Sequence, residues 1–118
     1  MEEITFPITL GESVGRYVPL YLGLDGKAYI MRNTDLFPKL FAGISKYAGE
    51  INQRIQVIRF GRVLDNNWNW SLAIRNLFIG DGMLTSIRPN QSRVIKVGYV
   101  VSWDTIILSP IFDIKLAR

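Results

Sequence analysis

The chain has 118 residues, which is enough for one domain with its own core. Of these residues 48% are apolar and 20% are charged, which is an ordinary balance for a globular protein. It contains no cysteine and no histidine, which excludes disulfides, thiolate nucleophiles, histidine-dependent hydrolysis and structural zinc sites. The net charge is +4, and its Lys and Arg residues are dispersed along the chain. No apolar run reaches the roughly 18 residues of a membrane span, so we expect no membrane partner.

Residues 4–10 alternate strictly between apolar and polar, which is typical of a strand with one buried face. Pro7 cannot donate a backbone hydrogen bond, so we expect this strand at a sheet edge or outside the sheet. Two alternatives follow: an edge strand of its own domain, or an arm that pairs with another chain. In the second case the partner-binding side chains are Ile4, Phe6, Ile8 and Leu10. The chain thus divides into an N-terminal arm and loop, 1–16, and one β domain, 17–118.

The rest of the chain is a series of short β-rich runs separated by turn residues. Asp25-Gly26 and Gly80-Asp81-Gly82 each predict a compact hairpin. Gly61, inside a strand run, predicts a bulge or a close backbone approach, and 34–39 leaves open one turn of helix. The predicted strands cover 17–22, 27–32, 40–45, 55–64, 77–79, 83–86, 94–101, 105–109 and 111–116, with breaks at Asp104 and Pro110.

This pattern predicts an all-β fold: a small β-barrel or sandwich of short antiparallel strands, with the extended N-terminal arm. No segment has a helical period over three turns, and we find no clear internal repeat.

No group of residues has the composition of a catalytic or metal site. Most acidic residues occupy turns, where aspartate is favoured for its geometry alone, so a catalytic pair of carboxylates is not expected. Asp65-Asn66-Asn67 lacks the spacing, the glycine and the glutamate of a calcium loop, and no phosphate-binding glycine motif is present. We therefore expect no enzyme activity, no catalytic residue, no bound metal and no cofactor.

Aromatic residues near arginines raise the alternative of single-stranded nucleic-acid binding. The best local match combines Phe60, Trp68 and Trp70 with Arg54, Arg59 and Arg62. Because the basic residues are dispersed, the electrostatic groove that such binding requires is weak, and a nucleic-acid partner is not expected. Trp68 and Trp70 would share one side of an extended segment. Whether they and Trp103 fill a core or contact another chain stays open.

Several segments between residues 40 and 114 follow one another in a recognisable order. They are Gly61-Arg62-Val63, Asn67-Trp68-Asn69-Trp70, Leu77-Phe78-Ile79-Gly80-Asp81-Gly82-Met83-Leu84-Thr85, Pro89, Val97-Gly98-Tyr99-Val100-Val101-Ser102 and Asp104-Thr105-Ile106-Ile107-Leu108-Ser109-Pro110. This series resembles small β domains of tailed-bacteriophage virions, found in capsid decoration (cement) proteins and in head- or tail-fibre segments. Trp103 departs from that family's pattern, which has a small residue there, and the N-terminal third is not covered.

The resemblance implies a virion structural protein that binds and stabilises the outer surface of a phage capsid. Its implied partners are the major capsid protein and copies of itself in a homotrimer, on virions whose proteins are made in the host cytoplasm. One alternative is a phage fibre or receptor-binding domain that recognises host surface sugars through Trp68, Trp70 or Trp103. The other is a single-stranded nucleic-acid-binding β-barrel.

Overall fold

The computed structural model describes residues 2–32, 40–90 and 95–111, which form nine strands and no helix. The strands are β1 (Ile4–Thr9), β2 (Pro19–Leu22), β3 (Ala28–Ile30), β4 (Leu40–Ser45), β5 (Arg54–Leu64), β6 (Asn76–Ile79), β7 (Leu84–Thr85), β8 (Lys96–Ser102) and β9 (Thr105–Ile111). All pairings between these strands are antiparallel. The prediction of a small all-β domain of short antiparallel strands is confirmed.

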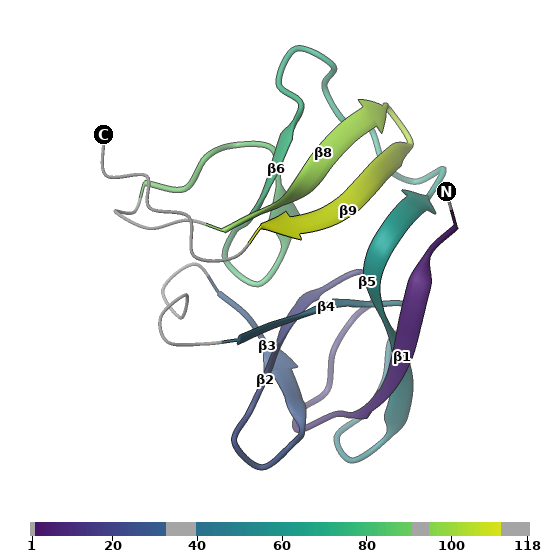
Figure 1. Ribbon diagram of the computed structural model, residues 1–118, viewed down its shortest axis with the longest axis vertical. Coiled ribbons are helices and arrows are strands. Elements are labelled where there is room, and N and C mark those ends of the chain that lie inside the picture. Colours follow the sequence, from purple (N-terminus) through teal and green to yellow (C-terminus); the bar gives the residue numbers. More distant parts are fainter. Residues whose placement is uncertain (1, 33–39, 91–94, 112–118) are drawn as a thin grey trace.

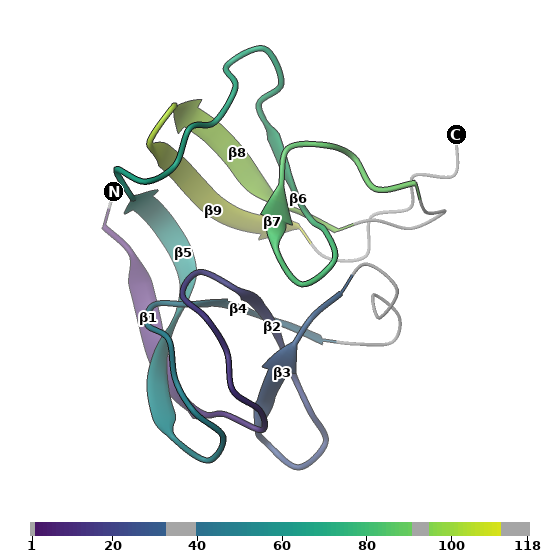
Figure 2. The same cartoon turned by 180° about the vertical axis from the view of Figure 1, so that it is seen from behind.

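The nine strands form one continuous, curled sheet. Its two parts, here called the first and the second sheet, share β5, which runs from one into the other (Figure 1). In the first sheet β5 pairs with β1 and β4, and the sheet continues through β2 to β3. In the second sheet β5 pairs with β9, and the sheet continues through β8 and β6 to β7, which Figure 2 shows from behind. Gly61 lies where β5 changes its pairing from β1 and β4 to β9. Its φ is +112°, and a Cβ there would overlap the backbone of Glu2. The predicted close approach at Gly61 is confirmed.

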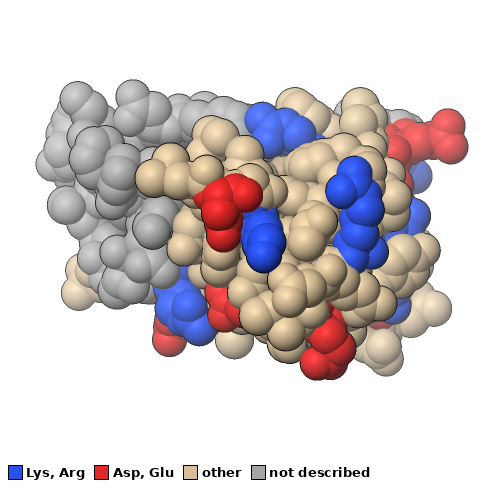
Figure 3. Space-filling view, turned by 90° about the horizontal axis from the view of Figure 1, so that it is seen from below, with Lys and Arg blue, Asp and Glu red and all other residues tan. Residues whose placement is uncertain are grey.

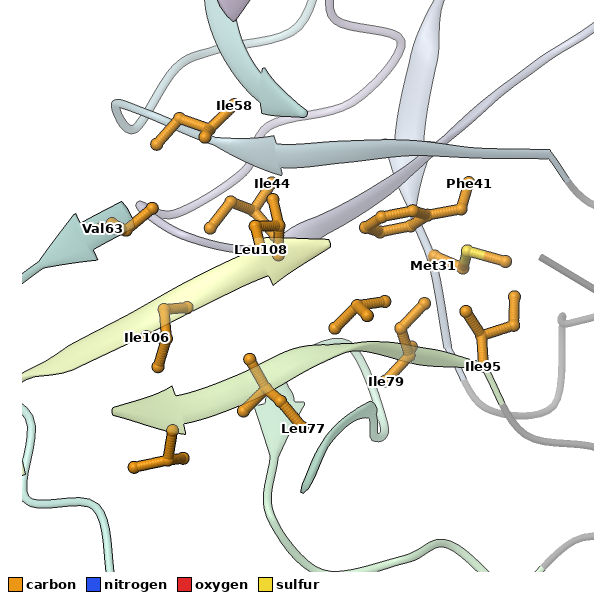
Figure 4. Packing of buried hydrophobic residues seen from close by; sticks show 12 residues of the cluster. Met31, Phe41, Ile44, Ile58, Val63, Leu77, Ile79, Ile95, Ile106 and Leu108 are labelled. Atoms are coloured by element: carbon orange, nitrogen blue, oxygen red, sulfur yellow. The ribbon is translucent and has the colours of Figure 1, made fainter. Parts of the chain in front are cut away.

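Two clusters of buried apolar side chains stabilise the molecule. The larger lies between the sheets, where β4 and β5 meet β6, β8 and β9 (Figure 4). The smaller lies inside the curl of the first sheet and includes Ile8, Leu10 and Leu20. Leu10 closes that curl through a bridge to Ala28 of β3. Since burial of one such side chain contributes about 1.5–3 kcal/mol, both clusters are substantial for a chain of this size.

The N-terminal segment is an edge strand of its own sheet, because β1 pairs with β5 of the same chain and with no other strand among the described residues. The structure thus places residues 4–9 in the first of the two alternatives, a strand paired within its own chain. Ile8 is only 6% exposed and Leu10 is fully buried, as the alternation predicts. Ile4 is 62% exposed, so its expected burial is wrong. The β-bulge between Ile4 and Thr5 shifts the register at this end of the strand.

Several predicted strand limits differ from the observed ones, among them the start at Tyr17 and the break at Pro110. Tyr17 does not begin a strand; its φ of +59° is left-handed, and β2 starts at Pro19. The break expected at Pro110 is absent, because β9 continues to Ile111. A register shift between Lys96 and Gly98 places two residues of β9 opposite one of β8, and such irregular pairing is where a sheet tolerates proline. The possible helical turn at 34–39 lies outside the described residues.

The fold is internally duplicated, although we found no repeat in the sequence. The first unit comprises β1, β2, β3, β4 and the beginning of β5, and the second comprises the end of β5, β6, β7, β8 and β9. The hairpin β2–β3, the pair β2–β4 and the pair β4–β5 recur as β6–β7, β6–β8 and β8–β9. The end of β5 lies along β9 as β1 lies along β5.

The register of the two units agrees at most of their paired positions. Leu20 faces Gly43 in the first unit and Leu77 faces Gly98 in the second, with a register shift directly after each leucine. Thr5 faces Ile58 as Arg62 faces Ile107. The hairpin turns correspond as well, since both Gly26 and Gly82 have left-handed φ values. A residue in one unit therefore has a defined counterpart in the other.

Candidate functional site

The duplicated units differ at one seam, and the candidate site lies there. In the first unit Gly11 donates its N–H to the Ala28 carbonyl at 2.8 Å, beside the Leu10–Ala28 bridge, and this closes the sheet. The loops 10–18 and 67–75 have the same length, so Asn67 corresponds to Leu10 and Trp68 to Gly11. In the second unit the Trp68 N–H instead donates to the Asp65 carbonyl at 3.0 Å, within a turn.

A pocket of about 390 Å³ opens at this seam. Its walls come from the loop before β2, the loop after β5, and β7. Leu84 of β7, the counterpart of Ala28, lines it together with Asn67 and Trp68. The second unit therefore has an open pocket at the position where the first unit has a hydrogen-bonded closure.

The residue at the closed seam and its counterpart at the open seam differ in size. A Cβ on Gly11 would overlap the Tyr29 ring, so the loop passes close to this side chain, whose counterpart in the second unit is the smaller Thr85. The counterpart of Gly11 in the second unit is Trp68, the largest side chain of all. The Trp68 indole forms part of the pocket wall.

Three aromatic side chains form one side of the pocket. The Tyr17 and Trp68 ring centroids lie 5.0 Å apart with planes inclined at 46°, and those of Trp68 and Trp70 lie 5.7 Å apart at 60°. All three are half-buried and pack against the larger core. Trp68 and Trp70, which the sequence predicted to share one side, are thus brought together, and Tyr17 joins them from a distant loop.

Polar and charged groups lie beside these rings. The Arg16 guanidinium stands 4.5 Å from the centroid of the Tyr17 ring, and Asp65 and Asn67 also line the pocket. Burial raises the pKa of Tyr17 above its ordinary value of 10.0, against the opposing effect of Arg16. The indole N–H of Trp70 is buried and has no acceptor among the described residues. Left-handed backbone at Tyr17 and an unsatisfied N–H are both unfavourable locally, and such features concentrate at binding sites.

A second surface of interest is the outward side of the second sheet. Cross-strand partners share a face, so Arg62, Ile107, Tyr99 and Asn76 form one row across four strands. Apolar side chains surround this row, and the exposed fractions are 62% for Ile4, 40% for Phe60, 55% for Leu64, 42% for Tyr99 and 40% for Val101. Ile4 faces Phe60 directly. We call these five residues the outer apolar face.

The residues predicted to bind a partner therefore lie in four different settings. Ile8 and Leu10 are inside the smaller core, Phe6 is half-buried against it, and Ile4 belongs to the outer apolar face. Trp68 and Trp70 line the pocket. Trp103 lies in the β8–β9 turn and is 49% exposed, and its backbone carbonyl accepts a hydrogen bond from the backbone N–H of Trp70 at 2.9 Å.

Sequence reasoning missed Arg16, Tyr17 and Asp65 as members of the pocket. The signal in the sequence is the pair of Asp-Gly turns at Asp25-Gly26 and Asp81-Gly82. Alignment of the two turns aligns the two units and makes Trp68 the counterpart of Gly11.

The described residues contain no group of three or more acidic side chains placed to hold a metal ion. Within the same part of the chain, no helix is long and apolar enough to cross a membrane. On the face shown in Figure 3, Lys and Arg are interspersed with Asp and Glu. Comparison of the sequence with known protein families and with curated proteins finds no match.

Proposed function

We propose that this chain is a non-catalytic structural protein of a tailed-phage virion, and that it binds and stabilises the outer surface of the assembled capsid. The observation that carries the proposal is the outer apolar face. An antiparallel sheet with one face in water ordinarily presents polar side chains on that face. Here Phe60 and Leu64 on β5 and Tyr99 on β8 are exposed on either side of β9, and apolar patches of this kind mark protein–protein contact sites.

The resemblance to phage decoration domains supports the same sheet as the contact surface. The segments that carry it, from Gly61 to Val63, from Val97 to Ser102 and from Asp104 to Pro110, belong to β5, β8 and β9. Of these three strands, β5 and β8 supply all of the outer apolar face except Ile4, and β9 lies between them. The partner is therefore the major capsid protein, with further copies of the chain, arranged as a trimer, as the second partner.

The nucleic-acid alternative receives less support from the charge distribution. Single-strand binding requires a continuous basic groove alongside aromatic side chains. The interspersed charges in Figure 3 provide no such groove on that face, and Asp65 lies within the aromatic pocket.

The proposal is tested with capsids of the phage that encodes the chain, assembled without it. We expect the purified protein to cosediment with them in saturable fashion at a fixed ratio to the major capsid protein. Leu64→Glu and Tyr99→Glu should each reduce the bound amount about tenfold or more, because a buried carboxylate would face the partner. Particles that lack the chain should adsorb to cells normally.

The matched control is Leu24→Glu, since Leu24 is fully exposed in the β2–β3 turn, away from the outer apolar face. This variant should bind capsids like the parent chain. Non-saturable binding, or equal losses for Leu24→Glu and Leu64→Glu, would refute the proposal. Loss of adsorption on removal of the chain would replace it with a receptor-binding function.

A further inference from the structure

We infer that the pocket between the two units is a carbohydrate site that accepts one pyranose ring of a neutral glycan. The inference goes beyond capsid binding and rests on different residues. Its basis is the open seam: the duplication shows how this fold closes there, and in the second unit Trp68 takes the place of the closing glycine. Trp68 thus packs against the larger core on one side and lines the open pocket on the other.

The pocket has the mixed chemistry that a sugar ring requires. A pyranose has an apolar C–H face, which packs on aromatic rings, and a rim of hydroxyl groups, each of which both donates and accepts hydrogen bonds. Tyr17, Trp68 and Trp70 supply the aromatic surface. Arg16 supplies donors, Asp65 acceptors and Asn67 both. The pocket volume of about 390 Å³ falls within the usual range for small-molecule sites.

The geometry favours a sugar over a nucleobase. A flat base is held best between parallel rings or on one open ring, whereas the planes of Tyr17 and Trp68 are inclined at 46° and those of Trp68 and Trp70 at 60°. The Asp65 carboxylate lines the same pocket, and it would repel the phosphates on either side of a bound nucleotide. A neutral ring with a hydroxyl rim meets neither obstacle.

The test uses the three tryptophans as reporters in the intact, ¹⁵N-labelled chain. The probes are methyl glycosides of glucose, galactose and mannose, and N-acetylglucosamine, titrated to millimolar concentrations. We expect at least one probe to shift the indole N–H signals of Trp68 and Trp70 in saturable fashion. Trp103 lies outside the pocket and should not shift. Sorbitol, which has hydroxyl groups but no ring, should shift none of them.

Variants of the polar rim keep the test independent of folding. Asn67 and Asn69 are both exposed in the same loop, but only Asn67 lines the pocket. Asn67→Ala should weaken binding of the active probe several-fold and Asn69→Ala should not, while Trp68→Ala should abolish it. No saturable shift with any probe, equal shifts at Trp103, or equal effects of the two asparagine variants would overturn the inference. Tighter binding of oligothymidylate at the same indoles would replace it with a nucleic-acid site. None of these outcomes depends on the capsid assay.

Discussion

Gly43 and Gly98 occupy equivalent positions in the two units, and each allows a close approach between two paired strands. Substitution of either glycine tests whether that close approach is needed for stability. A Cβ on Gly98 would overlap the Ile107 carbonyl oxygen, and one on Gly43 would overlap that of Ile58. Both obstacles are backbone atoms of a paired strand, so they cannot move aside like a side chain. We expect Gly98→Ala to lower the free energy of unfolding by about 1–3 kcal/mol, as overpacking does, in urea denaturation.

The matched control for that variant is Gly15→Ala. A Cβ on Gly15 would meet only Val18 Cγ2, at an ordinary contact distance of 3.7 Å. This variant should stay within about 0.5 kcal/mol of the parent chain. Equal losses for the two alanine variants would show that close backbone approach is not the reason for glycine in β8.

The stability of the fold is expected to be sensitive to acid because of Asp104 in the β8–β9 turn. The hydroxyls of Ser102 and Thr105 donate to the Asp104 carboxylate at 2.8 and 2.9 Å, and they hold the pKa of Asp104 below its ordinary value of 3.8. The ionised form is thus favoured in the folded state. Its contribution to stability is present above the unfolded-state pKa and is lost as the pH falls through the folded-state pKa.

We therefore expect Asp104→Asn to flatten the acid side of the stability profile. Between about pH 5 and pH 2 the parent chain should lose more in Tm than the variant does, because the variant has no carboxylate to protonate at this turn. Thermal unfolding followed by circular dichroism at a series of pH values measures the difference. Parallel profiles would contradict the assignment of this hydrogen-bonded carboxylate as an acid-sensitive element.

At the scale of elements, β1 has one buried end and one exposed end, and the two isoleucines in it should differ accordingly. Ile8 is 6% exposed within the smaller core, whereas Ile4 is 62% exposed. Ile8→Ala should cost about 2–5 kcal/mol of unfolding free energy, and Ile4→Ala should change it by less than about 0.5 kcal/mol. Chemical denaturation of both variants is the measurement. Similar costs would mean that Ile4 is buried in solution, for example by a second chain.

The strands and hairpins could be predicted because their signals are local. Asp25-Gly26 and Asp81-Gly82 mark turns by backbone requirement alone, and the alternation in residues 4–10 predicts which side of β1 is buried. Ile4 and Pro110 were predicted wrongly because a bulge and a register shift depend on the neighbouring strand, which the local pattern does not contain. The duplication is not evident in the sequence, because residues at corresponding positions, such as Leu10 and Asn67, have side chains of different polarity.

At the scale of the whole molecule, the pocket shows why a site can be invisible in sequence. Its aromatic side combines Tyr17, from the loop before β2, with Trp68 and Trp70, from the loop after β5. The sequence paired the two tryptophans because they are neighbours in the chain. No local pattern relates them to Tyr17, since that contact depends on how the shared strand β5 sets one unit against the other.

The two units are expected to unfold together, because β5 belongs to both sheets and the larger core takes side chains from both. All three tryptophans lie in loops of the second unit, so their fluorescence reports on that unit, whereas far-ultraviolet circular dichroism reports on both. Leu20 is fully buried in the smaller core of the first unit, and Leu20→Ala should cost about 2–5 kcal/mol. If unfolding is cooperative, this substitution will shift the fluorescence and dichroism transitions in urea by the same amount, and the two curves will coincide. A fluorescence transition that stays at the parent midpoint while the dichroism transition moves would show that the second unit holds its structure alone, and that the duplicated halves are independent domains.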